Sequence, residues 1–297
     1  MRRNLAALVS LFSMLSATFV TAAEIDWKKV DAAIGKTAAQ SGNVHRYGLP
    51  RTDLHLTLDG VEIKTAFALG GWMGFEAMGD SAMMMGDLVL TESEINPVMA
   101  KLLAQNIDVT AVHHHLLRAV PATFYMHFGA HGDPVKLAQS VREALSASKT
   151  PFDSPAAVAA TPAPEIGFDT AKIEEAIGFK GKNNSGVYQF GVPRLDPVKA
   201  AGMAIPGPMG SDNVINFQPT GGGKAAITGD FLALAKEVTP LLKALRSNGI
   251  EVTAVHSHML DDEPRAFFVH FWANDDAAKL AKGIRAALDA VHVAPRG

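Results

Sequence analysis

The chain has 297 residues and contains no cysteine. It can therefore form no disulfide bond, offers no thiolate to a metal ion and has no thiol for a lipid anchor. Any metal site in this protein must be built from histidine, carboxylate or methionine side chains.

Several familiar motifs are missing as well. There is no Gly-x-Ser-x-Gly turn, no glycine-rich phosphate loop followed by Lys and Ser or Thr, no His-Glu-x-x-His helix and no dinucleotide fingerprint. The formal net charge is only -3, so neither nucleic acid nor an anionic membrane surface is expected as a partner. A small molecule is the partner class that these absences leave open.

The first 23 residues have the pattern of a secretory signal peptide. Arg2 and Arg3 precede an apolar run, and Thr21-Ala22-Ala23 supplies small residues for cleavage before Glu24. No other segment has the length and apolarity of a membrane span. We therefore expect a periplasmic or secreted protein without stable membrane insertion once residues 1–23 are removed.

The remaining chain is an internal duplication with a constant offset of 143 residues. The densest match pairs Ile107–Leu117 with Ile250–Leu260, where 8 of 11 residues are identical. An Ala- and Pro-rich stretch between the copies is typical of a linker. We expect a first repeat over residues 24–146, a linker over 147–165 and a second repeat over 166–297.

The hydrophobic pattern of the first repeat predicts an α+β domain, a mainly antiparallel sheet with helices packed on one face. Expected helices are Trp27 to Ile34, Glu92 to Gln105 and Asp133 to Leu145. Expected strands are Val44 to Leu49, Leu54 to Phe67, Ala82 to Leu90, Asp108 to Leu117 and Ala122 to Ala130. The short loop over residues 118–121 should join the last two strands in a hairpin.

Histidines in this hairpin form the main functional pattern. Because side chains alternate along a strand, His113 and His115 should share a face that His114 does not. If residue numbers across the hairpin sum to 240, His127 lies opposite His113; a sum of 239 would place it on the other face. Three neutral imidazoles on one patch suit zinc and leave a coordination position open.

The second repeat keeps His256, His258 and His270 but replaces the middle histidine by Ser257. The retained trio predicts a divalent metal site in each repeat, most simply for zinc. The alternatives are that these histidines hydrogen-bond within a polar seam of the sheet, or that the two copies have not yet diverged there.

Other polar residues are candidates for a supporting role. Arg51 and Asp53, repeated as Arg194 and Asp196, would either hold an anionic group or form a local salt bridge at a turn. Asp87 and Asp230 would either accept a hydrogen bond from a ligand imidazole or stabilise a turn. His55, Glu62 and Trp72 occur only in the first repeat and are candidates for a pocket there, whereas the cluster Met83-Met84-Met85 is best explained by core packing.

Taken in order, these motifs resemble one known family. They are Gly-x-Pro-Arg-x-Asp, Gly-Asp, Glu-x-x-Pro, Thr-Ala-x-His-x-His and Pro-x-x-Phe-x-x-His, each present twice. The chain resembles the DUF1259 family, also called LppY/LpqO after mycobacterial lipoproteins. The resemblance implies an exported envelope protein with duplicated domains, although the cysteine that would anchor a lipoprotein is absent.

We therefore expect an exported protein that binds a divalent metal through its two histidine trios. A metal-bound water in the first repeat would then serve hydrolytic or lyase-type chemistry. The alternative is a non-enzymatic periplasmic module that binds a small ligand between the repeats. A third reading, a structural envelope protein, would use the region of Trp72 as a contact surface.

Overall fold

Each repeat folds into an antiparallel sheet that carries its helices on one face. The computed structural model describes residues 24–152 and 164–295. In the first repeat the helices are α1 (Trp27–Ile34), α2 (Thr65–Ala68), α3 (Glu92–Ala104) and α4 (Pro134–Leu145). The strands are β1 (Ala39–Ser41), β2 (Val44–Pro50), β3 (Thr57–Leu58), β4 (Val61–Glu62), β5 (Gly70–Met78), β6 (Ser81–Thr91), β7 (Asp108–His113) and β8 (Thr123–Gly132).

The second repeat has the same order of main elements. Its helices are α5 (Thr170–Ile177), the 3-10 turn η1 (Gly207–Met209), α6 (Ala235–Ser247) and α7 (Ala277–Leu288). Its strands are β9 (Lys182–Asn184), β10 (Val187–Val192), β11 (Lys199–Ala200), β12 (Met203–Ala204), β13 (Asn213–Gly221), β14 (Lys224–Leu234), β15 (Glu251–His256) and β16 (Ala266–Asp276).

The two main sheets have equivalent topology. The first runs β1-β2-β5-β6-β8-β7, and the second, read from its other edge, runs β9-β10-β13-β14-β16-β15. All of these neighbours pair antiparallel. The structure confirms the predicted fold class, two tandem α+β domains with mainly antiparallel sheets.

Local sequence explains where the main helices begin. At the start of α3, the side chain of Glu94 accepts a hydrogen bond from the backbone N–H of Thr91 at 2.8 Å, which satisfies a donor that the helix leaves free. At the start of α4, Asp133 accepts from the N–H of Val135 at 2.9 Å, and Pro134 occupies the first helical position. Each helix then buries an apolar face against its sheet.

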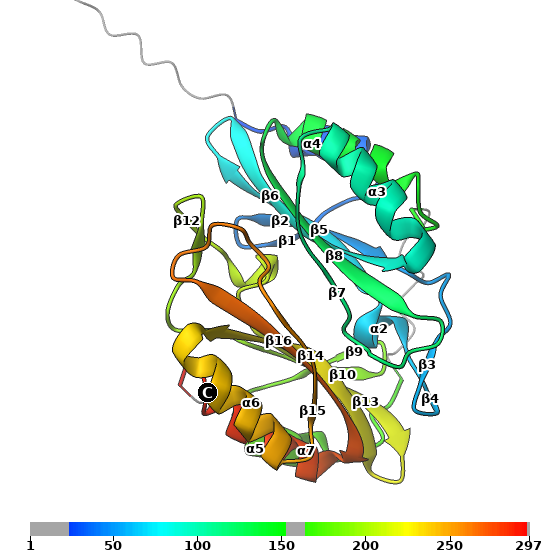
Figure 1. Ribbon diagram of the computed structural model, residues 1–297, viewed down its shortest axis with the longest axis vertical. Helices are drawn as coiled ribbons and strands as arrows, with labels where there is room; N and C mark the ends of the chain where they lie inside the picture. Colours follow the sequence, from blue (N-terminus) through cyan, green and yellow to red (C-terminus); the bar gives the residue numbers. More distant parts are fainter. Residues whose placement is uncertain (1–23, 153–163, 296–297) are drawn as a thin grey trace, which may run out of the picture.

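The helix-free faces of the two sheets pack against each other. Figure 1 shows α3 and α4 on the outer side of one sheet and α6 and α7 on the outer side of the other. Two apolar clusters fill the interface, and each combines side chains from both repeats: one includes Met83 and Leu232, the other Leu116 and Trp272. The loop around α2 adds polar contacts, since Asn216 Nδ2 donates to the carbonyl of Phe67 at 2.9 Å. The duplication therefore creates one continuous molecule with an internal interface.

Three local expectations were wrong. The stretch from Leu54 to Phe67 is two short strands and the helix α2 rather than one long strand. The strand β5 was missed, because the sequence GGWMGFEAM has too little apolar alternation to predict one. The strand β7 ends at His113 rather than Leu117, so His115 lies beyond it.

The described residues also bear on two wider expectations. Within residues 24–152 and 164–295, no helix is both long and apolar enough to cross a bilayer. The predicted signal peptide, residues 1–23, and most of the predicted linker lie outside the described residues.

Candidate metal centre

The strand register places the trailing histidine on the same face as the His-x-His pair. In the first repeat His127 pairs with Ala111, and Tyr125 pairs with His113. The second repeat has the same register, with His270 opposite Ala254. The numbers across the hairpin sum to 238, which is neither of the two registers considered; His127 shares the face of His113 but lies opposite Ala111, two residues from the position that a sum of 240 would give. In both repeats a bulge interrupts the pairing just before this point.

All six histidines of the two trios meet at the interface between the repeats. The rings of His113 and His256 are stacked with centroids 3.6 Å apart, and they lie at the middle of the group. The rings of His115 and His270 are 3.7 Å apart. On the opposite side, the rings of His127 and His258 are also 3.7 Å apart. The two predicted separate sites are therefore one six-histidine cluster.

Each His-x-His pair lies closest to the trailing histidine of the other repeat. Potential ligand atoms of His113, His115 and His270 lie within 4.8 Å of one another, and so do those of His113, His127, His256 and His258. We therefore group His113 and His115 with His270, and His256 and His258 with His127. The grouping follows the contacts of His115 and His258, since the ring of His256 lies 4.9 Å from that of His270 and 5.7 Å from that of His127. We call these two sets the exchanged trios. A third grouping, Asp230, His258 and His270, lies within the second repeat alone, whereas among the described residues no grouping consists of first-repeat side chains alone.

The cluster is enclosed, and its ring nitrogens lack partners. His115, His127, His258 and His270 are 8%, 5%, 9% and 0% exposed. The buried Nε2 atoms of all six histidines accept or donate no hydrogen bond among the described residues. Leaving a buried polar atom unpaired costs about 1–3 kcal/mol, so a polar seam of mutually bonded histidines does not describe this cluster. Nitrogen atoms that converge without protein partners are the arrangement a bound metal ion requires.

The environment keeps these imidazoles neutral. Burial, together with the neighbouring His270, lowers the pKa of His113 to about 3 and that of His256 to about 2. Burial also holds the pKa values of His115, His127 and His258 well below the usual range. Neutral imidazole is the form that coordinates a metal, so the ligands need not lose protons at pH 7.

Two aspartates accompany the trailing histidines on the neighbouring strands. Asp87 pairs with His127, and Asp230 pairs with His270. Asp230 Oδ1 lies 2.6 Å from Nδ1 of His270, which also contacts the Gly229 carbonyl at 3.0 Å. Asp87 Oδ1 lies 4.0 Å from Nε2 of His127. Both Oδ1 atoms are buried without a hydrogen-bond partner among the described residues, so the two aspartates adjoin the cluster, and their role as acceptors for a ligand imidazole stays a prediction.

Asp87 is itself a poorly stabilised carboxylate. Burial and the nearby Asp230 raise its pKa well above the usual range, and Arg46 only partly offsets them. Two carboxylates from different repeats therefore lie close enough to repel at the histidine cluster. A cation between them would favour the charged form of both.

The middle histidine has a structural role instead. Nδ1 of His114 contacts the carbonyl of Thr123 at 3.1 Å, outside the cluster. In the second repeat the hydroxyl of Ser257 donates to the equivalent carbonyl, that of Ala266, at 3.1 Å. The replacement of histidine by serine thus preserves a backbone contact and leaves the six-histidine cluster unchanged.

Comparison with known families identifies the repeats. A family model described as "Domain of Unknown Function (DUF1259)" matches residues 28–147 and 171–290. The chain belongs to the DUF1259 family. The two matched segments have the same offset of 143 residues as the internal repeat, which confirms two tandem DUF1259 domains.

Other comparisons add little to this assignment. No curated protein matches the DUF1259 chain. Among solved structures, a trimeric bacterial microcompartment shell protein, PduB, is 12% identical, with 86% of this chain and 90% of that chain covered and a TM-score of 0.22. EtuB from Clostridium kluyveri is 9% identical, with 85% and 90% covered and a TM-score of 0.18. TM-scores this low support no conclusion about fold or function.

Arg51 and Arg194, which occupy equivalent positions in the two DUF1259 repeats, form ion pairs at a turn. Arg51 is fully buried, binds Asp53 at 2.8 Å and binds Glu94 of α3 at 2.7 Å. In the second repeat, Arg194 binds Glu237 at 2.7 Å and Asp196 at 3.3 Å. This is the local salt bridge that the sequence favoured, extended to the first turn of a helix.

The residues found only in the first repeat do not gather in a pocket. His55 and Glu62 are exposed, and Glu62 lines an open groove with Lys64 and Gln218, away from the histidines. Trp72 is half-buried in the interface between the repeats, where Arg46 lies 4.4 Å above its ring. Trp72 therefore contacts the second repeat instead of forming a free surface.

Proposed function

We propose that this DUF1259 protein binds a divalent metal ion, zinc in the simplest case, in the six-histidine cluster between its repeats. The observation that supports this most directly is the convergence of six buried Nε2 atoms without hydrogen-bond partners. Three imidazole nitrogens form a familiar ligand set for zinc, and the absence of cysteine leaves histidine as the strongest ligand type in the chain.

We further propose that the exchanged trios are the ligand sets. His113, His115 and His270 would form one set, and His256, His258 and His127 the other. Each set takes ligands from both repeats, so each would need both repeats in place, although Asp230, His258 and His270 of the second repeat also lie close enough together to hold an ion. Metal binding would then also stabilise the interface between the repeats, because it requires both to be in place.

The proposed chemistry follows from the donor set. When bound by three imidazoles, a divalent ion lowers the pKa of a bound water or polarises a substrate oxygen. The Gly229 carbonyl would accept from Nδ1 of His270, at 3.0 Å, and so direct Nε2 toward the cluster, while Asp230 Oδ1 lies 2.6 Å from the same Nδ1. Hydrolytic or lyase-type chemistry confined to the first repeat is not supported, since every close grouping includes a second-repeat residue.

The geometry favours a metal-binding role over the binding of an organic ligand between the repeats. Apolar side chains fill the interface on both sides of the histidines. The cavity that reaches the cluster beside His258 has a volume of only about 80 Å³. A larger groove of about 680 Å³ between the repeats, lined by Glu62, Lys64 and Gln218, lies away from the histidines, and an organic ligand would find more room there than at the cluster. We also propose that the protein acts outside the cytoplasm, on the basis of the signal-peptide pattern in residues 1–23.

Elemental analysis of the purified mature protein tests this proposal. We expect at least one zinc or similar ion per chain after dialysis against metal-free buffer. The variant His113→Ala/His256→Ala, which removes one ligand from each exchanged trio, should lose most of the metal. His114→Ala is the matched control and should retain it. A wild-type protein that binds no metal, even when refolded with Zn²⁺, would refute the proposal.

A further inference from the structure

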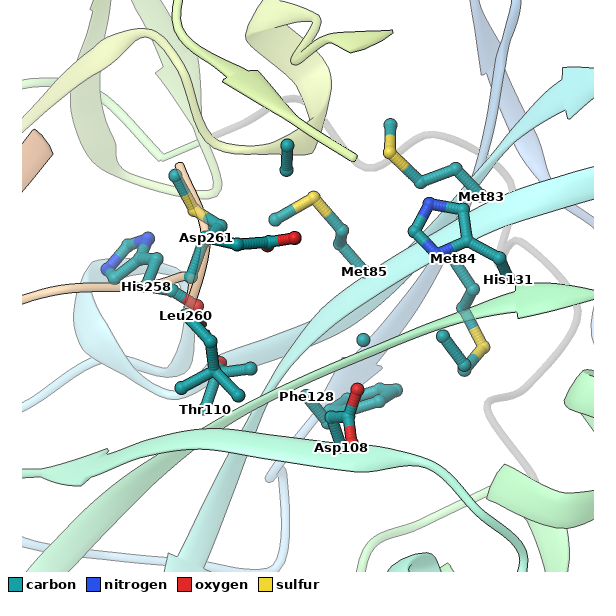
Figure 2. A pocket seen from close by; sticks show the side chains of 14 residues that line it. Met83, Met84, Met85, Asp108, Thr110, Phe128, His131, His258, Leu260 and Asp261 are labelled. Atoms are coloured by element: carbon teal, nitrogen blue, oxygen red, sulfur yellow. Dashed lines mark hydrogen bonds between the residues drawn. The ribbon is translucent and has the colours of Figure 1, made fainter. Parts of the chain in front are cut away.

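A cavity adjoins one side of the histidine cluster. The cavity is lined by His258 of the second repeat and by side chains of β6, β7 and β8 of the first. Figure 2 shows His258 and Asp261 on one side of it, Met83 and His131 on the other, and Met85 between them. His258 is 9% exposed, and its Nε2 has no hydrogen-bond partner. A buried, unpaired ligand atom therefore adjoins this space.

The lining of the cavity suits a cation. The exposed side chains at its outer end include Asp108, His131 and Asp261, and the described lining residues include no lysine or arginine. Further in lie the thioethers of Met83, Met85 and Met259. Carboxylate, imidazole and thioether are all groups that bind metal ions, and none of them repels a positive charge.

The equivalent position on the other side of the cluster is filled. Gly129, which lines the cavity, corresponds to Trp272 in the second repeat, and Trp272 is only 3% exposed. The indole Nε1 of Trp272 donates to Asp59 at 3.1 Å. A bulky side chain thus occupies the space that a glycine leaves empty beside His258.

The surface charge also differs between the two sides of the cluster. Asp108 and Asp261 correspond to Glu251 and Arg118 of the other side. Arg118 binds Glu251 through two hydrogen bonds of 2.8 Å and also binds Asp59. A salt bridge therefore closes the surface over Trp272, whereas two carboxylates face the surface over Gly129.

From this asymmetry we infer that metal ions enter and leave the histidine cluster by one route, between Asp108 and Asp261, past Met85, to His258. This inference rests on the proposed function, since it assumes that the cluster binds a cation. The trio of His127, His256 and His258 is then the first to be reached from solvent. The trio of His113, His115 and His270 is filled from within, because Trp272 and Arg118 cover its outer side.

Rapid-mixing measurements of Zn²⁺ uptake by the metal-depleted full chain test the route. Gly129→Trp introduces the side chain that Trp272 provides on the other side of the cluster. Asp261→Arg introduces the charge that Arg118 provides there, at an exposed position where the substitution should not disturb folding. Both variants should take up Zn²⁺ about tenfold or more slowly than the wild type while reaching the same final content. Glu175→Arg, which changes the same charge on the exposed surface of α5, should take up Zn²⁺ at the wild-type rate.

The outcomes separate the two proposals. Wild-type uptake rates in both Gly129→Trp and Asp261→Arg, with full final content, would overturn the route and leave the metal centre intact. A lower final content in Asp261→Arg would also overturn it, because that side chain would then act on affinity and not on entry. If the wild type takes up no Zn²⁺ even after refolding in its presence, the proposed function fails, and the route fails with it.

Discussion

The ring of His115 in the first repeat lies 3.7 Å from the ring of His270 in the second. The symmetric contact, between His258 and His127, has the same distance. These two contacts join the His-x-His pair of each repeat to the trailing histidine of the other. A duplication that began as two copies of one domain has become a single structure at this position.

We predict that the buried arginines stabilise the fold without taking part in metal binding. Arg51→Ala would leave Glu94, whose side chain is only 8% exposed, without its ionic partner. The loss should lower the free energy of unfolding by about 3–5 kcal/mol, measured by urea denaturation. Metal content per folded chain should not change. A variant that unfolds like the wild type but loses its metal would contradict this separation of roles.

The metal-free protein should lose stability in acid. The pKa of His113 is about 3 and that of His256 about 2 in the folded state, against a usual value of 6.5. Above pH 6.5 His113 and His256 are neutral in both the folded and the unfolded chain, so protonation of these two groups does not reduce the free energy of unfolding. Below it the unfolded chain binds protons that the folded chain does not, which costs about 1.4 kcal/mol per pH unit for each group until the folded pKa is reached.

Urea denaturation of the metal-depleted protein at about pH 7.5 and about pH 5 measures this effect. The variant His113→Gln/His256→Gln should show a smaller difference between the two pH values than the wild type. An equal difference in the two proteins would show that other groups dominate the pH dependence.

Asp230 should act on metal affinity through His270. Its Oδ1 lies 2.6 Å from Nδ1 of that ring, so Asp230→Asn removes a negative charge beside the imidazole. We expect the affinity for Zn²⁺ to fall by about 10–100-fold, with unchanged stoichiometry at saturation, in a competition titration against a chelator. Asp275→Asn, on the exposed end of β16, is the control. Equal affinities in the two variants would remove Asp230 from the site.

The glycine before this aspartate is required by the sheet. A Cβ on Gly229 would lie 1.9 Å from the carbonyl oxygen of Val214 on the neighbouring strand. Gly229→Ala should therefore destabilise the protein by about 1–3 kcal/mol or more, as measured by thermal or urea unfolding. Gly70→Ala is the matched control, since nothing lies within 4 Å of its Cβ. Similar stability of the two variants would contradict the close approach of β13 and β14.

Much of this architecture follows from local sequence patterns. The capped starts of α3 and α4 and the hairpin itself were predictable, because capping and strand alternation depend on neighbouring residues. The register that brings His127 to the face of His113 was not, because a shift of one residue would have placed it on the other face. The strand β5 was not, since its glycines and mixed polarity give a weak alternation signal. The role of Ser257 was also hidden, because it depends on a backbone carbonyl that only the folded hairpin brings close.

The exchange of the trios could not be predicted from one repeat at a time. Periodicity indicates which face of a strand a histidine occupies, but not what that face packs against. The signal that pointed to the interface was indirect: six histidines kept at one offset, on sheet faces that carry no helix. Packing the two sheets face to face places His270 beside His115, and that step depends on the tertiary structure.

The most direct test of the shared centre compares the metal content of two double variants. His115→Ala/His270→Ala damages only one exchanged trio, whereas His115→Ala/His127→Ala damages both, although each variant lacks two imidazoles. The structure predicts that the first variant retains clearly more zinc per chain than the second. If each repeat instead binds metal with its own trio, the order is reversed, and that result would contradict the account.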